Sequence, residues 1–142
     1  METYFTDKEF ISLAEFFLRI FLGILFFFQG YDKLINLKLG KVIETFQQEF
    51  ESKKLPRFVH VLAAYFSSCT ELIGGLLLLL GLFRGIALVA LGLDLVLVSL
   101  AFSYLHPLRD MRHVFPRFIL LILLLLFPSE NALFSLDYLI KK

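Results

Sequence analysis

The feature of this sequence that most constrains its fold is a set of long, nearly uninterrupted apolar runs. Three of them, residues 11–30, 58–80 and 85–105, are long enough to form helices that cross the roughly 30 Å of hydrocarbon in a bilayer. Hydrophobic residues make up 58% of the 142-residue chain and charged residues only 19%. A soluble domain has nearer 25% charged residues, so we predict an integral membrane protein.

A fourth apolar run is shorter and contains prolines. Pro116–Phe127 alone is too short to cross a bilayer, so we predict a helix over residues 107–127 that carries Pro116 as a kink. Four crossings place both chain ends on the same side of the membrane. The predicted fold is therefore an all-α integral membrane four-helix bundle, formed by a single domain over residues 1–142.

The connection between the first two predicted membrane helices is patterned at helical spacing. Apolar residues recur every three or four positions over residues 38–50, with charged and amide side chains between them. This pattern predicts an amphipathic interfacial helix. The helix either lies on the membrane surface or folds over the mouth of the bundle, and the sequence leaves both arrangements open.

Charge and cysteine content exclude several classes of function. The formal net charge of +1 gives no basic field for nucleic acid, so we expect no nucleic-acid partner. The single cysteine excludes an intramolecular disulfide framework, and the three histidines lack the spacing of metal ligands, so we predict no metal site. Lysines and arginines are more numerous in the first and third connections than near the termini, which favours both termini outside the cytoplasm.

Four ionisable side chains interrupt the apolar runs far from their ends. They are Arg19, Glu71, Asp94 and Arg117. An ionisable group in hydrocarbon costs at least ~2.5–3.5 kcal/mol, so we expect these groups to face the bundle interior and to pair. Counted from the end of the bundle that carries the termini, all four lie roughly 12–15 Å deep. The sequence thus predicts one buried polar layer near the midplane.

Four further residues are predicted to support this layer. They are Glu15, Tyr31, Lys33 and His113. Glu15 lies one helical turn before Arg19, and His113 lies one turn before Arg117. The other two end the first helix and are predicted to lie at the mouth of a site. For these two, anchoring among lipid headgroups is the alternative.

Three interpretations of the polar layer remain open from the residues alone. The layer is a structural ion-pair network that fixes the order of the helices, a site for a polar headgroup such as that of a quinone, or part of a transport pathway. Intramembrane ionisable residues are functional candidates by default, but structural networks of charges occur as well.

Several motifs together resemble the DoxX/DoxD family of small four-helix membrane proteins. In chain order they are Arg19-Ile-Phe-Leu-Gly23, Gly30-Tyr-Asp-Lys33-Leu34, the stretch from Glu71 through Gly74-Gly75 to Gly81 and Arg84, Asp94, and Phe134-Ser135-Leu136-Asp137. The resemblance implies a multi-pass protein of a bacterial or archaeal plasma membrane. It places Arg19, Lys33, Glu71 and Asp94 at family positions, whereas Arg117 is not assigned by it.

The resemblance also implies a function. The family takes its name from a subunit of a thiosulfate:quinone oxidoreductase, and other members are associated with redox-stress membrane complexes. We therefore expect a membrane subunit of a quinone-linked redox complex, with a sulfur compound or oxidative stress as its context. In this hypothesis Arg19 donates hydrogen bonds to a quinone oxygen and Glu71 delivers a proton.

At most, the chain is an oxidoreductase subunit that acts with a partner protein, and no catalytic residue is identified. We expect no intrinsic cofactor, with quinone as the ligand, and the lipid bilayer and a soluble or membrane redox protein as partners. Oligomerisation is left open. The alternatives are a non-enzymatic scaffold or assembly factor, with a structural ion-pair layer, and a pathway for small solutes or protons.

Overall fold

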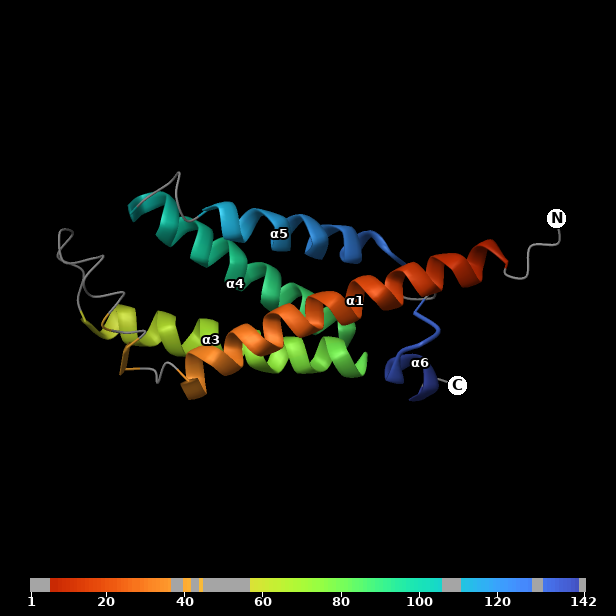
Figure 1. Cartoon of the computed structure of the whole chain (residues 1–142), viewed down its shortest axis with the longest axis horizontal. Helices are drawn as coiled ribbons and strands as arrows, with labels where there is room; N and C mark the ends of the chain where they lie inside the picture. The colour runs from red at the N-terminus through yellow and green to blue at the C-terminus, as the bar shows by residue number, and fades with distance from the viewer. Residues whose placement is uncertain are drawn as a thin grey trace.

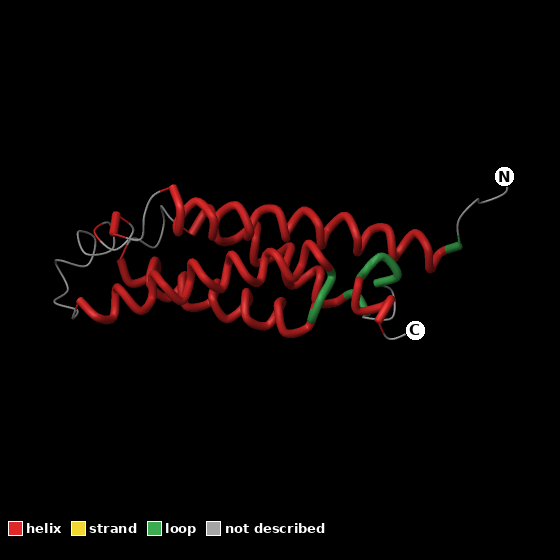
Figure 2. The backbone as a smooth tube through the Cα atoms, turned by 90° about the horizontal axis from the view of Figure 1, so that it is seen from below, coloured by secondary structure: helices red, strands yellow, loops and turns green. Residues whose placement is uncertain are grey.

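The computed structural model describes residues 6–36, 40, 41, 44, 57–105, 111–128 and 132–140. Regular structure in this part of the chain is helical throughout (Figure 2). In chain order the elements are α1 (Asp7–Tyr31), the π-helical turn η1 (Asp32–Asn36), α3 (Arg57–Leu80), α4 (Arg84–Leu105), α5 (Met111–Leu126) and α6 (Leu136–Ile140). The predicted all-α architecture with four apolar helices is confirmed.

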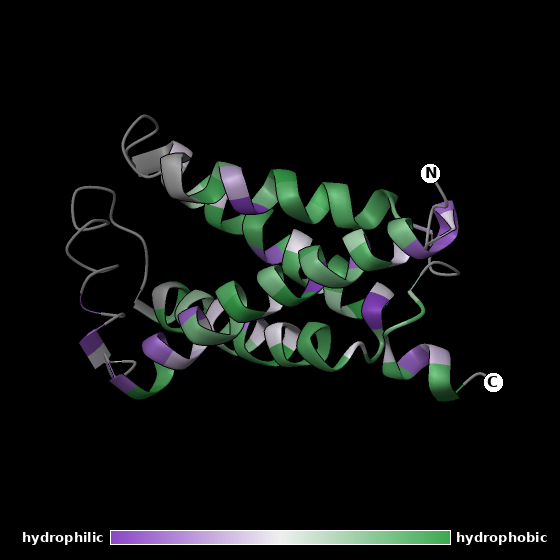
Figure 3. Cartoon of the chain, turned by 45° about the vertical axis from the view of Figure 1, so that its right-hand side comes forward, coloured by the Kyte–Doolittle hydropathy of each residue, from purple (hydrophilic) through white to green (hydrophobic). Residues whose placement is uncertain are grey.

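The apolar character of the helices is that of membrane-spanning segments. Asp7–Asn36, Val61–Leu80 and Arg84–Ala101 are long and apolar enough to cross a bilayer, and Val114–Leu126 is a shorter apolar helix. Hydrophobic colouring covers most of the helical surface in Figure 3. Many phenylalanines, leucines and isoleucines point outward, as lipid-facing side chains do.

Helix α1 begins before the predicted residue 11, and the reason is a capping box. The backbone N–H of Thr6 donates a hydrogen bond to the Glu9 carboxylate at 2.7 Å. A threonine followed three residues later by glutamate is a typical helix start. As a result α1 is one turn longer at its N-terminus than its apolar run indicates.

Two predicted segments fall outside the described residues. Of the predicted interfacial helix over 38–50 the structure describes only Gly40, Lys41 and Glu44, and the predicted start of the fourth helix at residue 107 is not described. The described helix α5 contains Pro116 in its first half and ends at Leu126, close to the predicted end.

The helices form a bundle with two distinct ends (Figure 1). We call the end with the α3–α4 turn and α6 the termini end, because α1 also starts there. The opposite end, where η1 lies and α3 and α5 begin, is the connection end. Helix α1 lies along α3, α4 follows α3 through a tight turn, and α5 lies along α4.

The contact between α1 and α3 depends on glycines in both helices. A Cβ atom added to Gly30 would lie 2.4 Å from the backbone nitrogen of Leu72, and one added to Gly75 would lie 2.4 Å from that of Phe27. The two backbones therefore touch directly, as small residues permit in membrane helices. This contact fixes the register, with Gly30 opposite Leu72.

The apolar core lies in the middle of the bundle and receives side chains from all four long helices. Its buried members are Leu22, Phe26, Leu78, Ala87, Leu88, Leu91, Leu95, Val114, Leu121 and Leu124. Most of this core lies between two groups of polar residues along the bundle axis, while Leu95 and Val114 lie beside the group at the connection end.

Candidate functional site

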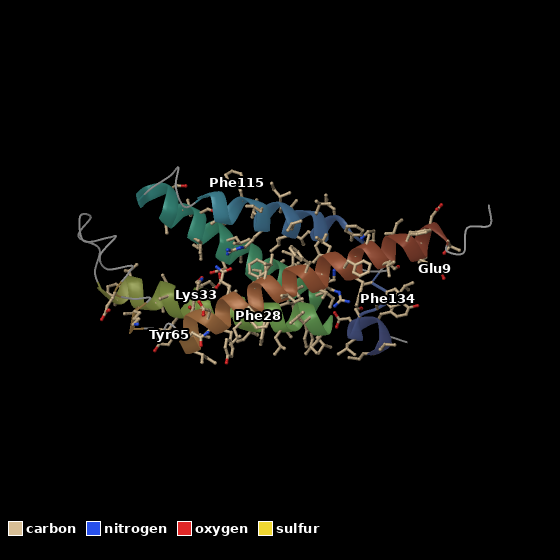
Figure 4. All side chains as sticks on the ribbon, in the orientation of Figure 1. Glu9, Phe28, Lys33, Tyr65, Phe115 and Phe134 are labelled. Atoms are coloured by element: carbon tan, nitrogen blue, oxygen red, sulfur yellow. The ribbon has the colours of Figure 1, made fainter. Side chains whose placement is uncertain are left out.

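The buried and half-buried ionisable side chains of the bundle form two clusters rather than one layer. The termini-end cluster consists of Glu15, Arg19, Arg84 and Asp137. The connection-end cluster consists of Lys33, Glu71, Asp94 and Arg117, with Ser67 and Ser68 beside them. Each cluster holds two basic and two acidic side chains. In Figure 4, Phe134 marks the first cluster and Lys33 the second.

The prediction of a single layer is wrong for Arg19. Because Gly30 lies opposite Leu72, Glu71 is level with Tyr31, about twelve positions or ~18 Å along α1 from Arg19. The predicted depth of Arg19 assumes that the first helix starts at residue 11, but α1 starts at Asp7 and extends past the α3–α4 turn. Arg19 therefore lies level with that turn, and Lys33 takes its place beside the two buried carboxylates.

Glu15 is the centre of the termini-end cluster. Its Oε1 atom lies 3.2 Å from Nε of Arg19 and 3.3 Å from Nε of Arg84. The Glu15 side chain is fully buried and Arg19 is 1% exposed. One carboxylate therefore serves two guanidinium groups in a dry environment, where an unpaired charge is costly.

Both arginines of this cluster also cap the C-terminal ends of helices. Nη1 of Arg19 donates to the carbonyl of Leu78 at 2.7 Å, at the end of α3. Nη2 of Arg84 donates to the carbonyl of Phe127 at 2.9 Å and also to that of Leu124, at the end of α5. Cations are stabilised at helix C-termini because each carries about half a negative charge. The two helix ends thus compensate the extra positive charge of two arginines on one glutamate.

The C-terminal segment completes this cluster. Nη2 of Arg19 donates to the carbonyl of Phe134 at 2.7 Å. The Asp137 carboxylate accepts hydrogen bonds from the backbone N–H groups of Phe83 at 3.0 Å and Arg84 at 3.1 Å, at the start of α4. A carboxylate at this position caps the helix and favours the positive end of its dipole. The termini-end cluster therefore joins four helix ends.

Asp137→Ala tests this capping role. We expect the substitution to lower the free energy of unfolding by about 1 kcal/mol, the usual contribution of an N-cap side chain. Thermal or denaturant unfolding of the purified protein in detergent measures the change. Asp137→Asn is expected to keep part of the stability, since its single amide oxygen can still accept a hydrogen bond from one of the two N–H groups. Equal loss in both variants would contradict capping as the cause.

The connection-end cluster is organised around an ion pair between η1 and α3. Nζ of Lys33 lies 2.6 Å from Oε2 of Glu71. Glu71 is 2% exposed, whereas the Lys33 side chain is 23% exposed, so the lysine reaches inward from the edge of the bundle. Lys33 lies within the π-helical turn, a local widening that often occurs at functional sites.

Asp94 is the less satisfied carboxyl of the connection-end cluster. Its Oδ2 atom accepts a hydrogen bond from Ser67 at 3.3 Å, while Oδ1 has no hydrogen-bond partner in the described part of the chain. The hydroxyl of Ser68 also lacks a partner there. Lys33 lies within electrostatic range of both Glu71 and Asp94, and Arg117 lies within range of Glu71. Buried polar atoms normally have partners, so these two oxygens mark a place where a ligand or water fits.

An open apolar hollow lies on α3, nearer the start of this helix than the connection-end cluster. It has a volume of about 550 Å³ and is lined by Phe58, Val61, Leu62 and Tyr65 of α3. Because Gly30 lies opposite Leu72, η1 ends at about the level of residue 66 of α3. The hollow therefore lies on the part of α3 that extends beyond η1. Val61, Tyr65 and Ser68 follow one another on one face of α3, so Ser68 lies about one helical turn beyond the hollow.

The remaining predicted residues have less central positions. The Tyr31 ring is 37% exposed and stacks on Phe27, with ring centroids 6.3 Å apart. His113 belongs to α5, but its side chain lies outside the described part of the structure. Among the residues that the structure describes, no group of three His, Cys, Asp or Glu side chains is placed to hold a metal ion.

Arg84 and Asp137 belong to the termini-end cluster but are not among the predicted site residues. Both belong to the motifs that resemble the DoxX/DoxD family, and membership of these motifs is the sequence signal that could have indicated their role. Their pairing depends on how the C-terminal segment folds back on the α3–α4 turn, which the apolar pattern does not indicate.

A comparison with protein families identifies the family of this chain. The family model described as DoxX matches residues 14–105. This chain belongs to the DoxX family. The match extends from α1 through α4 and so includes Lys33, Glu71 and Asp94 of the connection-end cluster, while Arg117 lies outside it. No curated protein and no solved structure matches the chain.

The DoxX match and the apolar helices together establish a DoxX-family multi-pass membrane protein. In the termini-end cluster Glu15, Arg19 and Arg84 lie within the matched residues and Asp137 outside them. The ligand-binding role of the predicted site residues stays a prediction.

Proposed function

We propose that this DoxX-family protein is the membrane subunit of a redox complex and binds a quinone at the connection-end cluster. The observation that supports this proposal is the combination of buried charged groups, two buried oxygens that lack partners in the described part of the chain, and an apolar hollow about one helical turn from Ser68. A quinone combines an apolar ring and tail with two polar oxygens, so it matches each of these features. The volume of the hollow falls within the range of about 300–1,000 Å³ typical of ligand pockets.

The residues of the cluster have distinct roles in this proposal. Phe58, Leu62 and Tyr65 contact the apolar part of the ligand. Lys33 and Arg117 supply positive charge close to the ligand oxygens, which favours electron uptake there. The electrons come from a redox cofactor of a partner protein. Arg19 has no role in ligand binding here, because its guanidinium group donates hydrogen bonds to the carbonyls of Leu78 and Phe134.

Two variants with matched geometry test quinone binding. Leu62→Trp places a large ring in the hollow and is expected to weaken binding of a decyl-substituted benzoquinone at least about tenfold, which corresponds to 1.4 kcal/mol. Leu93→Trp, on the lipid-facing side of α4, is the control and is expected to bind as the wild type does. Binding is measured by titration of the purified protein in lipid nanodiscs.

Two results would contradict quinone binding at the connection-end cluster. If the wild-type protein carries no quinone after purification in a mild detergent, by mass spectrometry, and binds none in titrations, the connection-end cluster is not a quinone site. Equal weakening in the Leu62 and Leu93 variants would also contradict it, since the effect would then come from the extra ring in the lipid and not from the hollow.

A non-enzymatic scaffold or assembly factor is the second candidate function. The termini-end cluster favours it, because Arg19, Arg84 and Asp137 bind helix ends and Glu15 pairs with the two arginines, which is a structural arrangement. A pathway for solutes or protons is not proposed. The two clusters are separated by the apolar core, so the described residues form no continuous polar track.

A further inference from the structure

The two carboxyls of the connection-end cluster differ in what they already bind. Glu71 is engaged by Lys33 at 2.6 Å, so its charge is matched by a direct ion pair. Asp94 is 1% exposed and receives only the hydroxyl of Ser67 on one of its oxygens. Its other oxygen, Oδ1, and the fully buried hydroxyl of Ser68 have no partner in the described part of the chain.

Unused hydrogen-bonding capacity in a dry interior shows where a polar ligand atom is accommodated. Leaving such an atom unpaired costs about 1–3 kcal/mol, and a ligand oxygen removes this cost when it binds. The free capacity lies on Asp94 and Ser68, which belong to the facing helices α4 and α3. The charged groups around Asp94 are Lys33 of η1 and Glu71 of α3, and Arg117 of α5 lies within electrostatic range of Glu71.

We infer that Asp94, and not Glu71, exchanges a proton with the bound ligand, with Ser68 as the second contact to the same ligand oxygen. This inference rests on the proposed quinone site. A carboxyl group suits the task because it donates a hydrogen bond when protonated and accepts one when ionised. Asp94 therefore keeps its hydrogen bond to the ligand oxygen in both oxidation states: it donates to the carbonyl of the quinone and accepts from the hydroxyl of the quinol.

The proton and electron balance of this step is complete. Conversion of a benzoquinone to the quinol takes two electrons and two protons. Both electrons come from the redox cofactor of the partner protein. Asp94 gives one proton to the ligand oxygen that it contacts, and water at the connection end supplies the other oxygen with the second. The Asp94 carboxylate regains its proton from the same water after the quinol leaves.

Infrared difference spectroscopy tests the inference with a readout other than turnover. The protein in nanodiscs is loaded with the decyl-substituted benzoquinone, which is then reduced with dithionite. We expect the carbonyl-stretch band of a protonated carboxyl group to disappear in the wild type and in Glu71→Gln. In Asp94→Asn this band change is expected to be absent. Asp7→Asn, an exposed position at the start of α1, is the control and behaves as the wild type.

A second variant keeps the test decisive if Asp94→Asn does not fold. Ser68→Ala removes one neutral hydrogen-bond partner and is expected to weaken binding of the quinone about five- to tenfold, which corresponds to 1–1.4 kcal/mol. Ser99→Ala is its control, because the Ser99 hydroxyl bonds only to the carbonyl of Leu95 within the described structure.

The outcomes separate this inference from the proposed function. If quinone binds but no carboxyl band changes, or the change persists in Asp94→Asn and is lost in Glu71→Gln, the inference is wrong and the quinone site stands. If Ser68→Ala binds as tightly as the wild type, the ligand oxygen lies elsewhere and the inference is also wrong. If the wild type binds no quinone at all, the proposed function itself fails.

Discussion

Glu15→Gln is expected to lower the free energy of unfolding by about 3–5 kcal/mol, the typical cost of removing one partner from a buried ion pair. The reason is that Arg19 and Arg84 would both lose the only carboxylate within ion-pair distance among the described residues, while remaining buried. Such a loss is a large fraction of the stability of a small protein. Unfolding in detergent, followed by circular dichroism, measures the change.

The double variant Glu15→Gln, Arg84→Gln identifies the cause of this loss. Removing one arginine together with the glutamate restores the balance of charge, so the combined loss is expected to be smaller than the sum of the single losses. Glu44→Gln, at an exposed position, is the control for loss of a carboxylate. If Glu15→Gln lowers the free energy of unfolding by less than about 1 kcal/mol, the ion pairs of Glu15 contribute no more than surface ion pairs do. That result would contradict the buried geometry described above.

Gly75→Val is the second substitution for which we expect a large effect. A Cβ atom at this position would lie 2.4 Å from the backbone nitrogen of Phe27 and 3.0 Å from the carbonyl oxygen of Gly23. Because backbone atoms cannot move aside as side chains do, the two helices must separate. We expect a loss of at least about 1–3 kcal/mol, the usual cost of overpacking, and a lower midpoint of thermal unfolding.

Gly85→Ala is the matched control for this experiment. A Cβ atom at Gly85 meets nothing within 4 Å, and alanine favours the helix over glycine by up to about 1 kcal/mol. The control is therefore expected to be neutral or stabilising. If Gly75→Val unfolds at the same temperature as the wild type, the close contact between α1 and α3 is not a determinant of the bundle.

Much of the fold can be predicted from the sequence, because membrane helices must satisfy two simple requirements. They need length to cross the hydrocarbon, and they need apolar side chains towards it. The bounds of α3 and α4 differ by one residue from the predicted 58–80 and 85–105. The start of α1 was also readable, since Thr6 and Glu9 have the spacing of a capping box, although the apolar run alone suggests a later start.

The candidate site is less predictable, because it depends on the register between helices. Depth counted along each helix placed Arg19 with Glu71, whereas the glycine contact between α1 and α3 sets them about 18 Å apart. The apolar pattern also does not show that α1 continues into a π-helical turn. That turn brings Lys33 to Glu71, so the residue predicted at the mouth of the site became part of it.

The bond between Arg19 and Phe134 joins residues 115 positions apart, and this separation bears on how the protein is made. The first helix enters the membrane long before the ribosome reaches residue 134. During that interval Arg19 has Glu15, one turn earlier on its own helix, and later the carbonyl of Leu78, but not the carbonyl of Phe134, to offset its charge. The nascent bundle therefore lacks this contact until the segment that contains Phe134 has been made. We expect chains that stop before residue 132 to be cleared by membrane proteases while the full-length protein accumulates.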